Sequence, residues 1–197
     1  MWAAQLIEKI SEKITSVGDE IAIYRDFSFY TIEEINFKSQ MATVRCRGTR
    51  RAIKQSFESI VGDTEILGGL SSIHACWIGA LYGRVLRASF EKKSALRKAN
   101  NMSFLLKNKK GKYSFIFENR TGEIGYLDQK SKKEFIEHPL TIARDNRIIS
   151  RFDPSQACYI GMLAGISLEK ALSMDERTGE NNTEKLLKKM SALRILD

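Results

Sequence analysis

The chain has 197 residues, a net charge of +8, 43% hydrophobic residues and 28% charged residues. This composition is typical of a globular protein, and the presence of only two prolines excludes a collagen-like chain or a long proline-rich linker. Two histidines and three well-separated cysteines predict no metal site, no cofactor and no disulfide framework. We therefore expect a reducing compartment and three free, buried thiols, Cys46, Cys76 and Cys158.

The N-terminal segment predicts an amphipathic helix followed by extended chain. Apolar residues recur at helical spacing over residues 6–17. Residues 21–30 alternate and are aromatic, which indicates one strand or a tight hairpin. Charged residues interrupt the apolar pattern of the first segment, so we expect no signal peptide.

The next segment predicts two helices with a strand between them. Thr31 with Glu34 three residues later forms a capping box, which indicates the start of a short helix. Residues 41–47 are interpreted as a strand. Thr49 can cap a second helix that ends near Gly62.

A long helix is predicted from Ser71 or Ser72 to about Phe90. The stretch 66–83 carries no formal charge, but it is short for a membrane span and polar at its start. We expect a buried helix and no membrane span. The Lys- and Asn-rich run that continues to Asn101 is interpreted as a loop or a frayed end.

The clearest strand signal follows this run. Three short segments separated by turn residues, 102–106, 112–118 and 123–127, predict a three-stranded antiparallel meander. Residues 130–137 then predict a short helix that Pro139 closes.

The C-terminal part predicts two further helices. Asp153 followed by Pro154 is a strong helix start, and this helix is expected to reach Met174. Thr183 caps a last amphipathic helix. The fold class is therefore α+β, with amphipathic helices packed on a small antiparallel β-meander. We expect one domain over residues 1–174, then a polar linker and C-terminal helix over 175–197.

Two nine-residue segments of the predicted long helices resemble each other. Residues 75–83 and 157–165 are identical at six of nine positions and share two glycines four residues apart. Each helical glycine costs about 1 kcal/mol relative to alanine, so packing should offset that cost. One interpretation is that the two helices cross each other, or a partner helix, at their glycines. The other is chance similarity between two buried helices, and the sequence leaves both open.

The positive charge lies in the middle of the chain. Residues 41–120 hold sixteen Lys and Arg against five Asp and Glu, for +11. A basic face binds acidic partners such as nucleic acid, anionic lipid or acidic protein. The alternative is a solvated surface without a partner. The first cluster of this region consists of Arg45, Arg47, Arg50 and Arg51.

Nothing in the sequence indicates catalysis. No P-loop and no G-x-G-x-x-G occur, and neither histidine lies in an arrangement typical of a nucleophile and its base. We expect no enzymatic activity and no catalytic residue. Residues 156–174 also resemble a helix-turn-helix, but the would-be recognition helix, residues 167–176, carries one Lys against three acids. The pattern favours a continuous or kinked core helix, and a nucleic-acid-binding regulator remains the alternative.

The first 125 or so residues resemble the small adaptors of the Dot/Icm type IVB secretion system, the IcmS and LvgA class. The resemblance rests on the N-terminal amphipathic helix, residues 21–26 (IAIYRD) with Phe29, the pair Glu33-Glu34, the Ala- and Gly-rich helix through 75–83 and the β-meander. It implies a small chaperone-like α/β fold, pairing with other proteins and no catalysis.

Residues and resemblance together predict a cytoplasmic, non-enzymatic adaptor or chaperone that binds partner or effector segments for a secretion system. We expect protein partners in a hetero-oligomer, with nucleic acid as the second choice. The predicted partner-binding residues are two apolar helix faces and the first arginine cluster, namely Trp77, Leu81, Leu187, Met190, Arg45, Arg47, Arg50 and Arg51.

Overall fold

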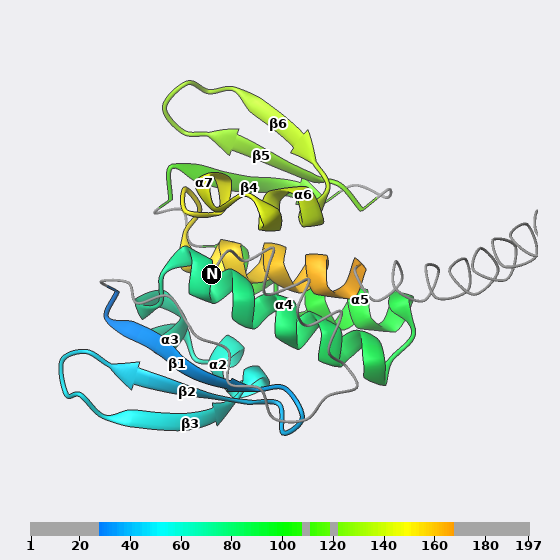
Figure 1. Cartoon of the computed structure of the whole chain (residues 1–197). Helices are drawn as coiled ribbons and strands as arrows, with labels where there is room; N and C mark the ends of the chain where they lie inside the picture. Colours follow the sequence, from blue (N-terminus) through cyan, green and yellow to red (C-terminus); the bar gives the residue numbers. More distant parts are fainter. Residues whose placement is uncertain (1–27, 108–110, 119–121, 168–197) are drawn as a thin grey trace, which may run out of the picture.

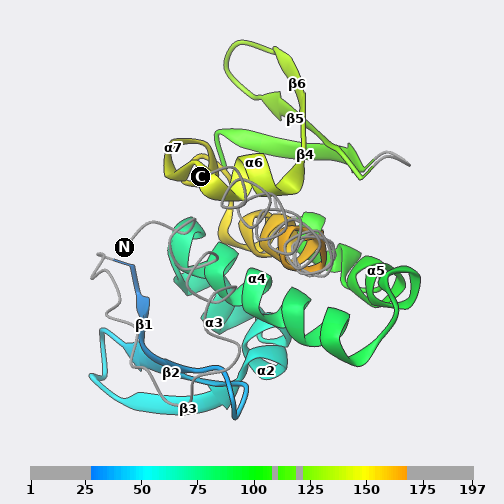
Figure 2. The same ribbon diagram turned by 45° about the vertical axis from the view of Figure 1, so that its right-hand side comes forward.

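The computed structural model describes residues 28–107, 111–118 and 122–167. Two long helices lie side by side at its centre: α4 (Ser72–Ser89) and the helix formed by residues 154–167, called helix 154–167 below. A three-stranded antiparallel sheet lies on either side of this pair (Figures 1 and 2). The fold is α+β, as predicted, but it contains two meanders instead of one.

Sheet A has the strand order β1-β2-β3 and precedes α4 in the chain. Its strands are β1 (Tyr30–Asn36), β2 (Met41–Cys46) and β3 (Ala52–Ser56). Alternate residues of β2 are buried against the helices, which is the pattern of a sheet with one covered face. The strand predicted over 41–47 is confirmed.

The helix predicted to begin at Thr31 is wrong, because this segment forms β1. A β-bulge lies between Ile32 and Glu34 in its pairing with β2. The extra residue allows Ile32 and Ile35, three residues apart, to be buried together. The bulge therefore produced the spacing that imitated a helix.

Three helices follow sheet A: α2 (Phe57–Gly62), α3 (Thr64–Gly69) and α4. The helix predicted from Thr49 is wrong in its first half, because residues 52–56 pair with β2 as β3. Each helix begins at a side chain that accepts a hydrogen bond from the backbone N–H groups of its first turn. These caps are Ser56, Asp63 and Ser71, and the last confirms the predicted start of α4.

The Lys- and Asn-rich run after α4 is not a loop but a helix, α5 (Lys92–Asn100). Ala95 and Ala99, four residues apart, are fully buried on its inner side. Two small residues at this spacing are enough for close packing, although the rest of the helix is charged. A 3₁₀ helix, η1 (Ser103–Leu106), replaces the first predicted strand of the meander.

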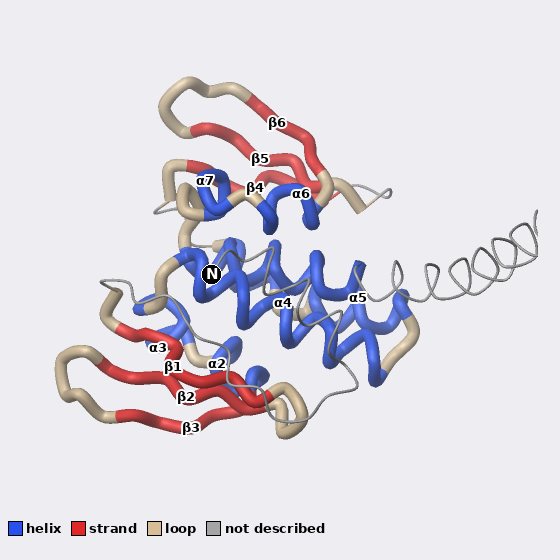
Figure 3. Tube along the Cα trace, in the orientation of Figure 1, coloured by secondary structure: helices blue, strands red, loops and turns tan. Residues whose placement is uncertain are grey.

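Sheet B has the order β4-β5-β6, with β4 (Tyr113–Glu118), β5 (Ile124–Asp128) and β6 (Glu134–Glu137) (Figure 3). The meander is present, but its third strand is the segment for which the sequence predicted a helix over 130–137. Residues 134–137 alternate in burial, and Lys132 takes a positive φ of 58° in the turn before them. That turn returns the chain along β5 instead of allowing a helix.

Pro139 begins a helix instead of closing one. Sheet B is followed by α6 (Pro139–Arg144), α7 (Asn146–Ile149) and helix 154–167. Proline at the first helical position loses no hydrogen bond, because that N–H has no partner within a helix. Helix 154–167 begins after Asp153, as predicted, and is described as far as Ser167. The helices predicted over 6–17 and from Thr183, most of the segment 21–30 and the linker after residue 174 lie outside the described residues.

The two central helices cross at the glycines that the sequence singled out. A Cβ placed on Gly79 would overlap the carbonyl group of Cys158, and one on Gly161 would overlap that of Cys76. The next pair repeats this reciprocity, because a Cβ on Gly83 would meet Met162 and one on Gly165 would meet Ala80. Of the two interpretations that the sequence left open, the one in which the helices cross each other at their glycines is confirmed. Each helix therefore contributes two glycines that contact the backbone of the other helix at equivalent positions.

The correspondence between the two halves of the chain extends beyond the helix crossing to most of the described elements. β3 and β6, α2 and α6, α3 and α7, and α4 and helix 154–167 begin in pairs whose members are 82 residues apart in sequence. β1 and β4 begin 83 residues apart, and each has its β-bulge at the same place in the strand. We call residues 30–89 the first repeat and residues 113–167 the second repeat.

The special positions of the two repeats also coincide. Gln40 and Gly122 both have a positive φ in the first hairpin of their repeat, and Arg50 and Lys132 both have one in the second. The caps Ser56 and Asp63 correspond to His138 and Asp145. Chance similarity of two nine-residue segments would not produce matching turns, bulges and caps, so the chain contains one structural unit twice.

Candidate functional site

Two of the side chains predicted to hold partners lie in the core. Trp77 and Leu81 have 0% exposure, on the α4 face packed into the molecule. No surface of either side chain is left for a partner, so the predicted role of these two residues is wrong. They belong to the hydrophobic core. Leu187 and Met190 lie outside the described residues.

The four predicted arginines are brought together on β2 and the β2–β3 turn. Arg45 forms an ion pair with Glu33 of β1, and its Nη1 donates to the carbonyl oxygen of Arg50 at 2.6 Å. Arg47, Arg50 and Arg51 are exposed. The arginine cluster is therefore one basic hairpin tip instead of a basic helix face.

The second repeat carries a basic tip at the equivalent place. Lys132 and Lys133 in the β5–β6 turn correspond to Arg50 and Arg51, and Lys130 precedes them. All three lysines are exposed. We call Lys130, Lys132 and Lys133 the lysine tip.

The helix-turn-helix that the sequence offered as the alternative over 156–174 is wrong in its described part. Helix 154–167 is continuous through Gly165 and Ile166, where the motif needs its turn. Gly161 and Gly165 face the backbone of α4, so the small residues serve the helix crossing. The interpretation of a core helix, which the sequence favoured, is confirmed as far as residue 167.

An exposed apolar row runs across sheet B on the face turned away from the helices. Phe117 pairs with Gly125, and Gly125 pairs with Ile136, so the three residues share a face across β4, β5 and β6. The ring of Phe117 lies over Gly125, where a Cβ would overlap it. Phe117 is 39% exposed and Ile136 59% exposed. We call these three residues the outer row of sheet B; Ile116 at the bulge beside it is 43% exposed.

The equivalent row of sheet A is polar. Glu34 pairs with Thr43, and Thr43 pairs with Lys54, at the positions that correspond to Phe117, Gly125 and Ile136. The Thr43 hydroxyl donates to Glu34 Oε2 at 3.1 Å. We call Glu34, Thr43 and Lys54 the outer row of sheet A. The same structural unit therefore carries a polar outer row in sheet A and an apolar outer row in sheet B.

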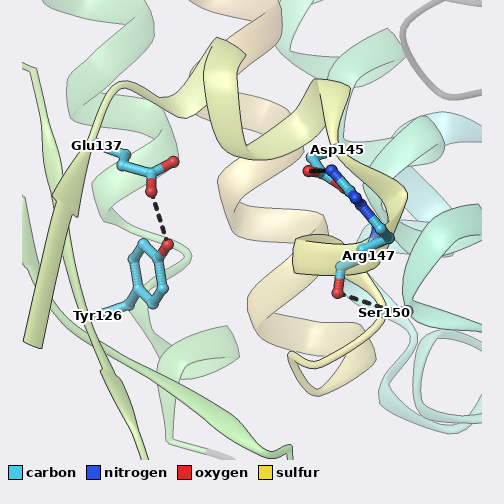
Figure 4. A network of polar contacts seen from close by, with 5 residues as sticks. All are labelled: Tyr126, Glu137, Asp145, Arg147 and Ser150. Carbon is cyan, nitrogen blue, oxygen red and sulfur yellow. Dashed lines mark hydrogen bonds and ion pairs between the residues drawn. The ribbon is translucent and has the colours of Figure 1, made fainter. Parts of the chain in front are cut away.

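The inner face of sheet B fixes the sheet on the body of the protein. Tyr126 and Phe135 are stacked with ring centroids 5.1 Å apart, and Phe152 meets Tyr126 edge-on at 5.4 Å. The Tyr126 hydroxyl donates to Glu137 Oε1 at 2.9 Å (Figure 4). Burial, with the Glu137 bond as a second cause, raises the pKa of Tyr126. Tyr126 therefore stays protonated at neutral pH and its hydroxyl joins β5 to β6, while its ring contact with Phe152 joins the sheet to the body of the protein.

The groups with altered pKa do not gather into a reactive site. Burial raises the pKa of the Cys76 thiol to about 12 and that of Cys158 above its ordinary value, since both lie within the helix crossing. The Cys46 pKa is lowered by hydrogen bonding to Thr49. All three thiols are free and buried, as predicted.

Two further searches cover the described residues. In that part of the chain no cluster of three or more His, Cys, Asp or Glu side chains could hold a metal ion. Over the same residues, no helix is long and apolar enough to cross a membrane.

Comparison of the chain with protein-family models, with curated proteins and with solved structures found no match. The functional argument therefore rests on the α+β unit and its two repeats.

The outer row of sheet B was missed at the level of sequence. Ile136 was assigned to a helix, and Phe117 to the middle strand of a meander whose first strand, 102–106, is replaced by η1. An alignment of the two repeats could have found the row, because it places Lys54 at the position equivalent to Ile136. The nine-residue similarity was not extended toward the N-terminus, so this difference stayed hidden.

Proposed function

We propose that this protein is a non-enzymatic cytoplasmic adaptor that holds a segment of a partner protein on the outer row of sheet B. The observation that carries the proposal is the apolar row in the second repeat at positions where the first repeat is polar. Sheet A demonstrates that the unit folds with Glu, Thr and Lys at these positions. The apolar side chains of sheet B are thus not needed to form the sheet.

Exposed apolar side chains that gather on one face have a physical cost. Each leaves apolar area in water at about 25 cal/mol per Å², and contiguous exposed apolar patches often serve as interaction sites. Among the described residues, six large hydrophobic side chains are exposed, and three of them, Ile116, Phe117 and Ile136, gather on this sheet. Covering them with a partner would remove that cost.

The secretion setting and the hetero-oligomer come from the resemblance to the Dot/Icm adaptors and belong to the same proposal. In this account the partner is a different protein whose segment is held for delivery. The basic hairpin tips provide electrostatic attraction and steer association, which raises the association rate more than the affinity. Nucleic acid is the competing occupant of the basic tips, and the experiment below distinguishes it.

The test compares variants that exchange the character of the two rows. Phe117→Glu with Ile136→Lys gives sheet B the residues that sheet A already carries, and Glu34→Gln with Lys54→Gln changes sheet A while keeping it polar. Tagged full-length proteins are recovered from their native cells with and without nuclease, and the recovered material is analysed by mass spectrometry.

We expect the wild-type protein and the sheet A variant to recover the same nuclease-resistant protein. The sheet B variant should recover at most about a tenth as much of it. Recovery of that protein by the sheet B variant at the wild-type level would contradict the proposal. Loss of all co-purifying protein after nuclease treatment would contradict the proposal as well, because the bound partner would then be a nucleic acid.

A further inference from the structure

We infer that the segment bound on the outer row of sheet B is an acidic amphipathic helix of a partner protein, with its acidic end at the lysine tip. The inference rests on the proposed function and specifies the chemistry of its partner. Three properties of the surface lead to it: its size, the edge of its sheet and its charge.

The size of the patch fits one helix and not a folded domain. Ile116, Phe117 and Ile136 are about half exposed, which leaves on the order of 250 Å² of apolar surface at ~150–250 Å² per large side chain. A stable interface between folded proteins needs about 800 Å² from each partner. A helix that places three or four apolar side chains at i, i+3, i+4 and i+7 covers a patch of the smaller size. A second copy of this chain is therefore disfavoured.

The edge of sheet B is unsuited to strand addition. Of the two edge strands, β6 has only four residues and carries Glu134 and Glu137 at its ends. On β4, the other edge strand, the backbone N–H groups of Tyr113 and Phe115 already donate to Arg151 O and Gln156 Oε1. Short edge strands that carry charges are the ordinary protection against a further strand. The exposed apolar side chains lie on the face of the sheet instead, so the occupant should lie across the face.

The charge at the end of the face favours an acidic occupant. Lys130, Lys132 and Lys133 are exposed in the β5–β6 turn, with the Lys133 ammonium 5.1 Å from the ring centroid of Phe135 on the inner side of the sheet. The carboxylates beside them are Glu134 and Asp128, and that of Asp128 accepts from the backbone N–H groups of Lys130 and Ser131, so the three lysines still leave the tip positive. The C-terminal segment of this chain, residues 183–197, has apolar residues but holds four Lys and Arg against two Asp and Glu. Like charges would oppose its docking at the lysine tip, whereas a helix with Glu or Asp at one end would be attracted.

The test uses three synthetic 18-residue peptides with one identical apolar stripe and the full-length protein. One peptide has Glu at the polar positions of its terminal turns, the second has Lys there, and the third is the Glu peptide with a central proline that breaks a helix. Fluorescence anisotropy gives Kd for each peptide at low and at physiological salt. The protein variants are Phe117→Glu with Ile136→Lys, Lys132→Gln with Lys133→Gln, and the matched control Arg50→Gln with Arg51→Gln. The control removes the same charge from the equivalent turn of sheet A.

We expect the Glu peptide to bind at least tenfold more tightly than the Lys peptide and the proline peptide. The lysine-tip variant should weaken the Glu peptide about fivefold, the matched arginine variant less than twofold, and the sheet B row variant beyond detection. Circular dichroism of each variant checks that it is folded.

Equal binding of the Glu and Lys peptides would overturn the inference, as would unweakened binding of the proline peptide. Equal effects of the lysine and arginine variants would also overturn it, because the attraction would then be a property of the net charge. If the row variant still loses its cellular protein while the peptides show no acidic preference, the proposed function stands and this inference fails. If the row variant keeps its cellular protein, the proposed function itself fails.

Discussion

The two repeats share residues in the core and differ in the residues on the outer faces of their sheets. Between residues 40–85 and the positions 82 residues later, nine of 46 residues are identical. In the first repeat eight of the nine are buried, and the ninth, Asp63, caps α3. The outer rows share no residue. The unit is thus specified by its core, its turns and its caps, while the outer face of a sheet is free to acquire a separate role.

The largest effect should come from the helix crossing, where the repeats are most alike. Gly79→Ala and Gly161→Ala each place a methyl group on the backbone of the opposite helix, and neither helix can move without disturbing the reciprocal contact. Each substitution should lower the free energy of unfolding by about 3 kcal/mol or more. The two losses should agree within about 1 kcal/mol, as measured by urea denaturation.

Gly68→Ala is the matched control for the crossing. Gly68 lies in α3, and a Cβ there has no atom within 4 Å. Alanine should raise the free energy of unfolding by about 0.5–1 kcal/mol, because it is the better helix former. If Gly79→Ala is as well tolerated as Gly68→Ala, the reciprocal crossing is not the centre of the fold.

The next largest effect on the free energy of unfolding should come from removing the side chains that cap α3 and α7. The Asp63 carboxylate accepts from the backbone N–H groups of Glu65 and Ile66 at 3.0 Å, and that of Asp145 accepts from Arg147 N at 2.8 Å. Asp63→Ala and Asp145→Ala should each cost about 1 kcal/mol in denaturation experiments. A cost at one position without a cost at the other would break the equivalence of the repeats.

A smaller, pH-dependent effect should come from the Asp145 cap. The Arg147 side chain donates to both Asp145 carboxylate oxygens, at 3.1 and 2.9 Å, and lowers the pKa of Asp145 below its ordinary value of 3.8 (Figure 4). A lowered folded-state pKa stabilises the protein above the unfolded-state value, and this contribution is lost as the pH falls through the folded-state pKa. Asp145→Asn keeps the cap, so it should cost about 0.5 kcal/mol at pH 7 and nothing near pH 2.

Arg147→Gln is the control for this pH dependence, because it removes the charged donor and leaves the Asp145 carboxylate in the cap. In the Arg147→Gln background the cost of Asp145→Asn should change less between pH 7 and pH 2 than it does in the wild-type background. Denaturation midpoints over this pH range measure the difference. A pH-independent cost at Asp145 would show that Arg147 contributes nothing to the cap.

Sequence reasoning succeeded where local chemistry is strong. The serine cap of α4, the Asp-Pro start of helix 154–167 and the strand over 41–47 were all predicted from residue type and spacing. The glycine crossing was one of two interpretations that the sequence left open. The meander was recognised, but only two of its three strands were placed, because the alternation in β6 covers four residues and resembles a helical turn.

The failures have physical causes that a local pattern does not contain. The bulge in β1 places Ile32 and Ile35 on one face and so imitates a helix. In α5 the buried side consists of two alanines among lysines, and tertiary contact with α4 forms the helix against its polar composition. For the site, the arginines gather as predicted, whereas Trp77 and Leu81 are fully buried in the core. Helical periodicity alone does not say which side of a long apolar helix stays exposed, and α4 packs on both α2 and helix 154–167.

The most direct test of the central claim is site-specific photo-crosslinking in native cells at the two equivalent positions 136 and 54. A photoreactive residue at Ile136 should join the protein to one partner, through a peptide that is acidic and amphipathic. The same residue at Lys54 should give no partner adduct, although the backbone around it is equivalent. Equal adducts at both positions, or none at 136, would contradict the claim that only the second repeat became a binding face.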